Sequence, residues 1–168
     1  MIGAINTIVA VVILATATSL SAETLSLPAF RIDLPDGWEY RAESRADSGV
    51  DNSSGQDRQV VLTLRHPDGV RSLKLLSFDA PDVVGANTLR NMTNVDASTP
   101  LTWQHWGDFS GYQYDYLERD SCFRQWWLVH EQTLLFITYQ GNPGSKASDT
   151  VDIDTLIRSL TAINPPPE

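Results

Sequence analysis

The serine whose surroundings come nearest to a hydrolase motif is Ser110, in the stretch Gly107-Asp108-Phe109-Ser110-Gly111. A nucleophile elbow needs Gly-x-Ser-x-Gly on a tight turn between a strand and a helix, because that turn exposes the hydroxyl. Here the first glycine stands three residues before the serine, and the surrounding pattern predicts a strand. The sequence therefore does not predict a serine nucleophile.

The histidines and the single cysteine are the other residues with chemistry near neutral pH. His66, His105 and His130 lie far apart, and none has a second histidine at i+4, so there is no helical zinc motif. Cys122 cannot form an internal disulfide, and we interpret it as a small apolar residue in a strand. A small hydrolase built from His105, His130, Asp115 and Cys122 stays open as an alternative.

Oxygen ligands gather in the segment 47–57, which contains Asp47, Asp51, Asn52 and Asp57. Calcium prefers many oxygen ligands, but the spacing of an EF-hand loop, with its central glycine and closing glutamate, is absent. The segment is polar, contains glycine and has no periodicity, which indicates a solvated loop. We therefore expect neither a metal nor a cofactor.

Aromatic residues form the best candidate for a binding site. Aromatic side chains with polar groups are favoured at protein interfaces, although they are also favoured in strands, so core packing is the alternative. The partner-binding residues that we predict are four aromatics with two charged residues as a polar rim, namely Trp103, Trp106, Tyr112, Tyr114, Asp115 and Arg124.

The composition is that of an ordinary globular protein with a strong negative charge. The chain has 168 residues, of which 42% are hydrophobic and 20% charged, and the size suggests one domain. The net charge is −9. Because binding to nucleic acid or to anionic lipid requires a basic surface, the charge argues against both partners.

The first residues have the layout of a secretory signal peptide. The apolar run Ile8 to Leu14 is followed by small residues, and Leu20-Ser21-Ala22 is a plausible cleavage site. The run is short for a membrane span, so we expect cleavage, with an uncleaved anchor as the alternative. No cysteine follows the run to carry a lipid anchor. We therefore predict a signal peptide at 1–22 and a periplasmic or secreted protein that is not stably inserted in the membrane.

Most of the remaining chain has the periodicity of antiparallel strands. The expected strands are Ala29 to Leu34, Trp38 to Tyr40, Val60 to Arg65, Ser72 to Phe78, a run in Leu101 to Leu117, Phe123 to His130 and Leu134 to Tyr139. The helices that we expect are Val83 to Val95 and one that begins near Ser148. The single domain then covers 23–163, and the proline-rich tail 164–168 is predicted to be disordered.

The adjacent Trp126 and Trp127 point to opposite faces of one strand, and both faces of that strand carry large apolar groups. This loss of clean alternation predicts burial on both sides and therefore a central strand with a helix layer on each face. We expect both tryptophans to be core residues. We also expect Trp127 to be the more costly loss, because Phe123 and Val129 share its face.

The order of these elements resembles the PsbP/DcrB-like fold. The residues that carry the resemblance are Phe30, Ile32, Leu34-Pro35-Asp36-Gly37-Trp38, Trp127-Leu128, Leu135-Phe136-Ile137-Thr138-Tyr139 and Ser159-Leu160. The resemblance implies an α+β fold, with an antiparallel sheet of six or seven strands covered by helices in an α/β/α sandwich. Several relatives have Asn-Gly at the hairpin that here reads His130-Glu131-Gln132-Thr133.

The resemblance also shapes the expected function. Relatives include photosystem accessory proteins, a Ran-binding transport factor, bacterial envelope proteins and secretion chaperones or immunity-like proteins. Most of these bind proteins or are uncharacterised, and catalysis is not typical of them. We therefore expect a non-enzymatic exported protein that binds another protein in the cell envelope, with an immunity or accessory role as the narrowest form. A small-ligand or lipid carrier and the small hydrolase are the alternatives.

Overall fold

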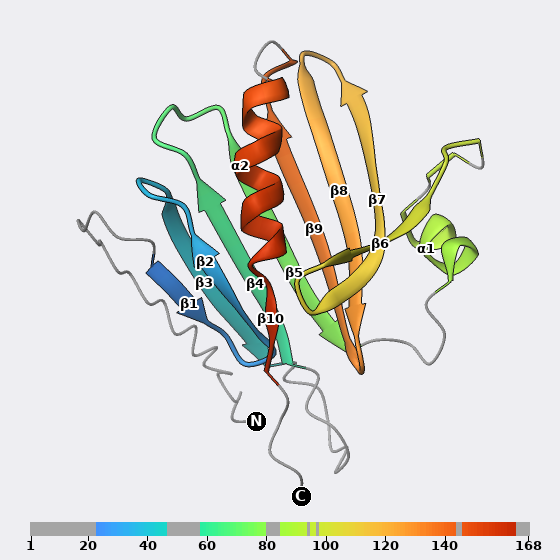
Figure 1. The fold of residues 1–168 in the computed structure, drawn as a ribbon, viewed down its shortest axis with the longest axis horizontal. Coiled ribbons are helices and arrows are strands. Elements are labelled where there is room, and N and C mark those ends of the chain that lie inside the picture. The colour runs from blue at the N-terminus through green and yellow to red at the C-terminus, as the bar shows by residue number, and fades with distance from the viewer. Residues whose placement is uncertain are drawn as a thin grey trace, which may run out of the picture.

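A computed structural model describes residues 23–46, 58–79, 85–93, 95–96, 98–143 and 146–163. The predicted signal peptide, the acidic loop 47–57 and the C-terminal tail lie outside these residues. Within them the chain forms a large antiparallel sheet and the helices α1 and α2, as the sequence predicted, and also a small sheet that the sequence did not predict (Figure 1). The α+β fold class is therefore confirmed.

The large sheet has seven strands in the order β3-β4-β5-β9-β8-β7-β6. Its strands are β3 (Glu39–Ala46), β4 (Arg58–Arg65), β5 (Ser72–Asp79), β6 (Thr102–Trp106), β7 (Phe109–Glu118), β8 (Ser121–His130) and β9 (Thr133–Gly141). Every pair of neighbouring strands is antiparallel, and all but β5–β9 are consecutive in the chain. The sheet is therefore two meanders joined where β9 pairs with β5.

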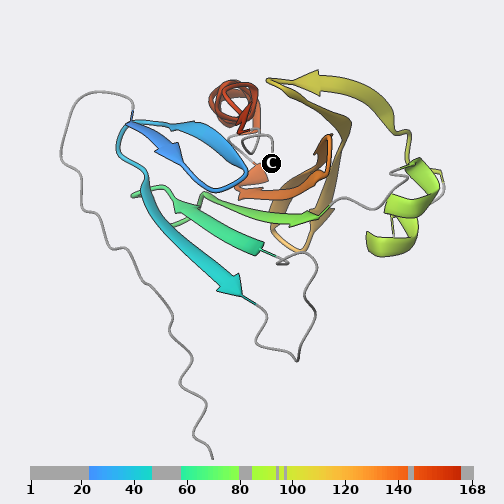
Figure 2. The same ribbon diagram turned by 90° about the horizontal axis from the view of Figure 1, so that it is seen from below.

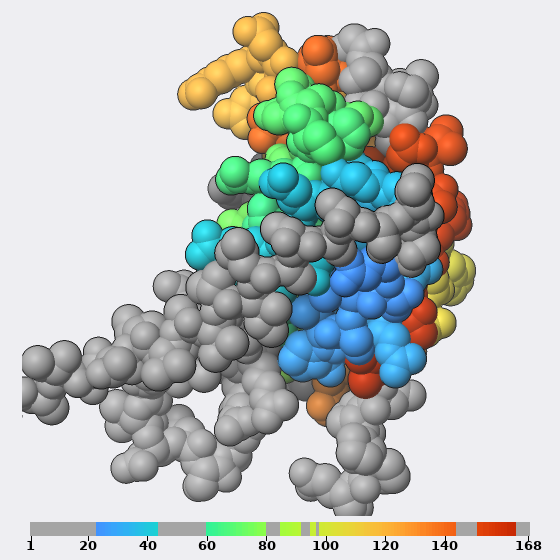
Figure 3. Space-filling model, turned by 90° about the vertical axis from the view of Figure 1, so that its left-hand side faces the viewer, coloured from blue at the N-terminus to red at the C-terminus, as the bar shows by residue number. Residues whose placement is uncertain are grey.

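The small sheet has the order β1-β2-β10, formed by β1 (Glu23–Ser26), β2 (Phe30–Leu34) and β10 (Thr161–Ala162). The sequence predicted β2 but not β1 or β10, because two to four residues are too few to show a reliable period. Seen from the side of β3, the surface of β1 and β2 lies between β3 and α2 (Figure 3). The small sheet thus closes one side of the core.

Helix α2 (Lys146–Arg158) lies across one face of the large sheet, which we call the inner face (Figure 1, Figure 2). Its apolar side chains Ile153, Leu156 and Ile157 belong to the main core. Helix α1 (Ala86–Thr93) is shorter than the predicted Val83 to Val95, and it lies at the β6–β7 end of the sheet, away from α2.

Strand β8 carries a buried tryptophan on each face of the large sheet. Trp126 is 0% exposed on the inner face, and Trp127 is 1% exposed on the opposite face, which we call the outer face. Both tryptophans are therefore buried, as the sequence predicted. On the outer face, however, most side chains of β7, β8 and β9 are only half-buried, and α1, at the β6–β7 end of the sheet, does not form the helix layer that the sequence predicted there.

A turn at Gly107 and Asp108 divides the predicted run Leu101 to Leu117 into β6 and β7. Gly107 has φ +63°, and a Cβ at this position would lie 2.0 Å from the carbonyl oxygen of Leu160. The Asp108 amide donates to that same carbonyl, and the Asp108 carboxylate accepts from the amide of Ala162. The sheet curls so that this turn clamps the end of α2 (Figure 2).

Candidate binding face of the large sheet

Aromatic side chains line up on the outer face, because the strand register places residues of the same parity side by side. Tyr112 lies opposite Trp103 and Trp127, and Tyr116 lies opposite Phe123. We call this set the aromatic face, and its members are Trp103, Tyr112, Tyr114, Tyr116, Phe123, Trp127 and Phe136.

The rings of the aromatic face contact one another along and across the strands. Ring centroids are separated by 5.0 Å for Trp103–Tyr112, 5.7 Å for Tyr114–Tyr116, 5.0 Å for Tyr116–Phe123, 5.2 Å for Tyr114–Trp127 and 6.5 Å for Trp127–Phe136. These separations lie in the range of favourable aromatic pairs. Trp127 forms a buried floor, whereas Trp103 on the edge strand is 45% exposed. The others are half-buried, so the face presents ring surface to solvent on a rigid support.

A polar network around Gln125 fixes two of the tyrosines. The Tyr114 hydroxyl donates to Gln125 Oε1, and Gln125 Nε2 donates to the Tyr116 hydroxyl at 3.5 Å and to Thr138 Oγ1 at 3.2 Å. Burial, with a smaller effect of Tyr116, raises the pKa of Tyr114 to about 12, and burial also raises the pKa of Tyr116. Both hydroxyls therefore keep their protons at neutral pH.

Of the predicted partner-binding residues, only Trp103, Tyr112 and Tyr114 belong to the aromatic face. Trp106 is 2% exposed and faces inward, where its ring meets Trp126 edge to face at 6.0 Å. The Arg158 guanidinium lies 4.6 Å from the ring centroid of Trp106, on the same side as α2. Trp106 is thus a core residue that helps to hold α2.

Asp115 and Arg124, predicted as a polar rim, also lie on the inner face. Arg124 donates from Nε to Asp115 Oδ1 at 2.6 Å and from Nη1 to Asp154 Oδ1 of α2 at 3.0 Å. Burial acts to lower the pKa of Arg124, but the hydrogen bonds and charges of the two carboxylates outweigh it and raise that pKa. Arg124 and Asp115 therefore link the sheet to α2 and lie on the opposite side of the sheet from the aromatic face.

The residues of the hydrolase alternative do not converge. Asp115 is engaged by Arg124, while the His130 Nδ1 lies 2.9 Å from the carbonyl oxygen of Asp108. Cys122 is buried near the other end of the strand that carries His130, about 26 Å away at the usual rise per residue. Asp115, His130 and Cys122 therefore do not meet in one reaction centre.

His105 and Ser110 form the one nucleophile–base contact among the residues considered, with Ser110 Oγ 2.8 Å from His105 Nδ1. In the described part of the chain no carboxylate contacts His105 to orient the ring, as a catalytic triad requires. The same residues contain no group of three His, Cys, Asp or Glu side chains arranged to hold a metal ion. They also contain no helix that is long and apolar enough to span a bilayer.

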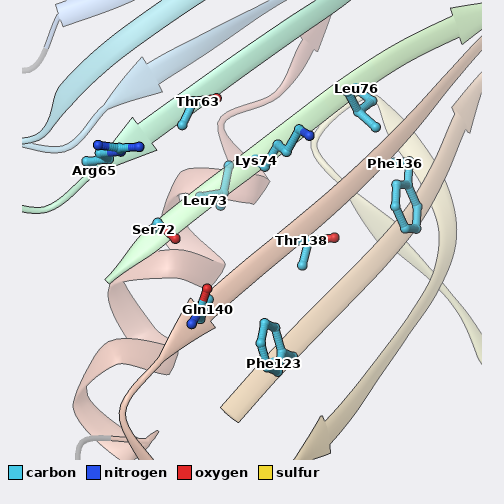
Figure 4. A pocket seen from close by; sticks show the side chains of 10 residues that line it. All are labelled: Thr63, Arg65, Ser72, Leu73, Lys74, Leu76, Phe123, Phe136, Thr138 and Gln140. Atoms are coloured by element: carbon cyan, nitrogen blue, oxygen red, sulfur yellow. The ribbon is translucent and has the colours of Figure 1, made fainter. Parts of the chain in front are cut away.

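A hollow on the outer face has a volume of about 370 Å³ (Figure 4). It lies over β4, β5, β9 and β8, and its lining residues are Thr63, Arg65, Ser72, Leu73, Lys74, Leu76, Phe123, Phe136, Thr138 and Gln140. Phe123 and Phe136 connect it to the aromatic face. Sequence reasoning missed this hollow, because its residues come from four strands whose pairing order is not written in any local pattern.

Comparison with known proteins identifies similar folds but no related sequence. No family model and no curated protein matches the sequence. The solution structure of cyanobacterial PsbP (CyanoP) from Synechocystis sp. is similar, with a TM-score of 0.54 at 12% identity over 89% of this chain and 99% of that one. A crystal structure from Bacteroides thetaiotaomicron has a TM-score of 0.50 at 13% identity over 80% of this chain, which spans only 45% of that protein. The chain therefore has a PsbP-like fold.

Proposed function

We propose that this chain is a non-enzymatic exported protein that binds another protein through the aromatic face of its large sheet. The observation that carries the proposal is the set of aromatic rings on the outer face of strands β6 to β9, which contact one another in two groups and, apart from the buried Trp127, are partly open to solvent. Rigid aromatic side chains give large contact area at low entropic cost, and tryptophan and tyrosine are, with arginine, the residues enriched in interface hot spots.

Export is proposed because of the predicted signal peptide at 1–22, and an envelope role follows from it. An immunity or accessory protein is the narrowest form of the proposal. A toxin gene beside the gene for this chain would support the immunity form, and the absence of one would favour an accessory role.

A small-ligand carrier is the second candidate, since a hollow of about 370 Å³ falls within the range of about 300–1,000 Å³ that ligand pockets occupy. The hollow lies on the face of a sheet and not between layers (Figure 4), so it would leave much of a lipid-sized ligand in water. For this reason we favour a protein partner.

Site-directed photo-cross-linking in the cell envelope tests the proposal. A photoreactive amino acid in place of Trp103 should give a discrete cross-linked band, because this position is 45% exposed at the edge of the aromatic face. The matched control replaces Val151, which is 66% exposed on α2 at the other face of the sheet. Equal cross-linking from both positions, or none from position 103, would contradict the proposal.

A further inference from the structure

We infer that the hollow on the outer face takes up a protein segment in which an acidic side chain stands next to an apolar one. The inference rests on the proposed function and adds the chemistry of the partner. Its basis is the combination, within one hollow, of two cationic side chains and two phenyl rings, namely Arg65, Lys74, Phe123 and Phe136. Figure 4 shows these groups around the same depression of the sheet.

Lys74 carries a charge that no acidic residue of the described part of the chain neutralises. Its direct partners across the sheet are Thr63 on β4 and Thr138 on β9. The other neighbours that the register places beside it on the outer face are Val61, Arg65, Ser72, Leu76, Phe136 and Gln140. None of these is acidic, although the chain has 21 acidic against 12 basic residues. A cation with no acidic partner among the described residues, in so acidic a protein, marks a place where an anionic group would be favoured.

Arg65 adds a second positive charge at the diagonal position, about 7–8 Å from Lys74 between Cα atoms for such a pair. Glu39 lies opposite Arg65 in the register, but within the described part of the chain Arg65 and Lys74 form no ion pair. By contrast Arg41, on the same face, is paired with Glu43 at 2.7 Å. One carboxylate could thus approach both Arg65 and Lys74. Neither side chain would have to break an ion pair with a described residue to bind it.

The apolar half of the hollow is continuous with the aromatic face. Phe123 stacks on Tyr116 at 5.0 Å, and Phe136 stacks on the buried Trp127 at 6.5 Å. An apolar side chain that packs against either phenyl ring would lose water on that side, and the register places the polar Thr138 between the two rings. The partner surface on the proposed binding face would therefore extend into this hollow.

The polar lining favours a polypeptide over an acyl chain. Hydroxyl and amide groups of Thr63, Ser72, Thr138 and Gln140 surround the cations, and such groups can donate to or accept from peptide amides. A fatty acid could place its carboxylate on Lys74, but the open sheet face would leave most of its methylenes in water. An acidic, apolar protein segment matches both halves of the lining.

Peptide binding to the protein purified from cells that make the full chain tests the inference. The first probe is a pool of blocked hexapeptides, acetyl-Gly-Ser-(Asp or Glu)-(Leu or Phe)-Ser-Gly-amide. The second pool has Asn or Gln in place of the acid, and the third probe is decanoate. We expect the first pool to shift the amide resonances of Lys74, Phe136 and Thr138, and to bind about fivefold or more tightly than the second, as expected for a partly exposed ion pair.

Two substitutions on the same face give a matched comparison. Lys74→Gln should weaken binding of the first pool about fivefold, whereas Arg41→Gln removes the same charge outside the hollow and should leave binding unchanged. Equal binding of the two pools, equal loss in both variants, or no shifts at the hollow would overturn the inference. Shifts with decanoate alone would overturn it in favour of a lipid ligand.

The outcome can be separated from that of the proposed function. Cross-links from position 103 that persist unchanged in the Lys74→Gln variant would retain the protein-binding role and reject the inference. Loss of all cross-links from position 103, with acidic peptides still bound at the hollow, would reject the proposed partner protein and retain the chemistry of the site.

Discussion

The two faces of the large sheet are built from different residues and are covered to different extents. The inner face packs aliphatic side chains of β4, β5 and β9 against α2 and the small sheet, and its main-core residues are almost completely buried. The outer face has aromatic rings, threonines and cations, and most of them are half-buried or exposed. The comparison indicates that the inner face holds the fold together, while the outer face, which is less covered, is the surface that we propose for recognition.

The paired tryptophans of β8 provide the strongest test of this difference. Trp126 lies in the main core, whereas Trp127 has the half-buried Tyr114 and Phe136 as neighbours, which can move to fill a gap. We therefore predict that Trp126→Ala lowers the free energy of unfolding by about 4–5 kcal/mol and Trp127→Ala by about 3 kcal/mol. This reverses the order expected from the sequence. Urea unfolding of both variants measures it, and a larger loss for Trp127→Ala would contradict the assignment of the faces.

The clamp on α2 is the next test of the inner face. Gly107→Ala places a methyl group against the Leu160 carbonyl and requires a non-glycine residue at positive φ. We expect it to lower the free energy of unfolding by about 2 kcal/mol. Gly69→Ala also sits at positive φ, but in open space, and should cost less. Equal losses in thermal unfolding of the two variants would show that the clamp contributes nothing.

The ion pairs of Arg124, a residue of β8, join the inner face of the sheet to α2. Asp154→Asn removes one carboxylate but leaves Asp115, which holds the guanidinium through two further contacts. We expect a loss of about 1 kcal/mol in the free energy of unfolding, as for a partly exposed pair. If the outer cation Arg41 is changed to Gln, the loss should be smaller, because its pair with Glu43 is more exposed. A larger loss for Arg41→Gln would reverse this ranking.

Alkaline pH tests the polar network of the outer face. The pKa of Tyr114 is raised from 10.0 to about 12 in the folded protein. The folded state therefore keeps a proton that the unfolded chain loses, so this contribution to stability is complete below pH 10 and is lost as the pH rises toward 12. Urea unfolding at pH 9 and pH 11 should show a smaller decrease for Tyr114→Phe than for the wild type. Identical decreases would indicate that Tyr114 ionises freely.

Local patterns in the sequence were sufficient for most of the large sheet but not for its surroundings. Alternation located β4 and β5, and the apolar run after Trp126 located β8 and β9 in the centre. The spacing of Tyr112 and Tyr114 placed them on one face, but which face α2 covers depends on contacts between distant parts of the chain. Arg124 illustrates this limit, because it was expected in a binding rim and instead reaches Asp154, thirty positions along the chain.

The most direct test of the account is the affinity of the partner cross-linked from position 103, measured together with protein stability. Trp103→Ser should raise the Kd for this partner about 30-fold, as for an interface hot spot of about 2 kcal/mol. It should change the free energy of unfolding by less than about 0.5 kcal/mol. The control Val151→Ser, an exposed apolar residue on α2, should change neither quantity. An unchanged Kd for Trp103→Ser, or a loss explained by reduced stability, would contradict the assignment of the outer face as the binding surface.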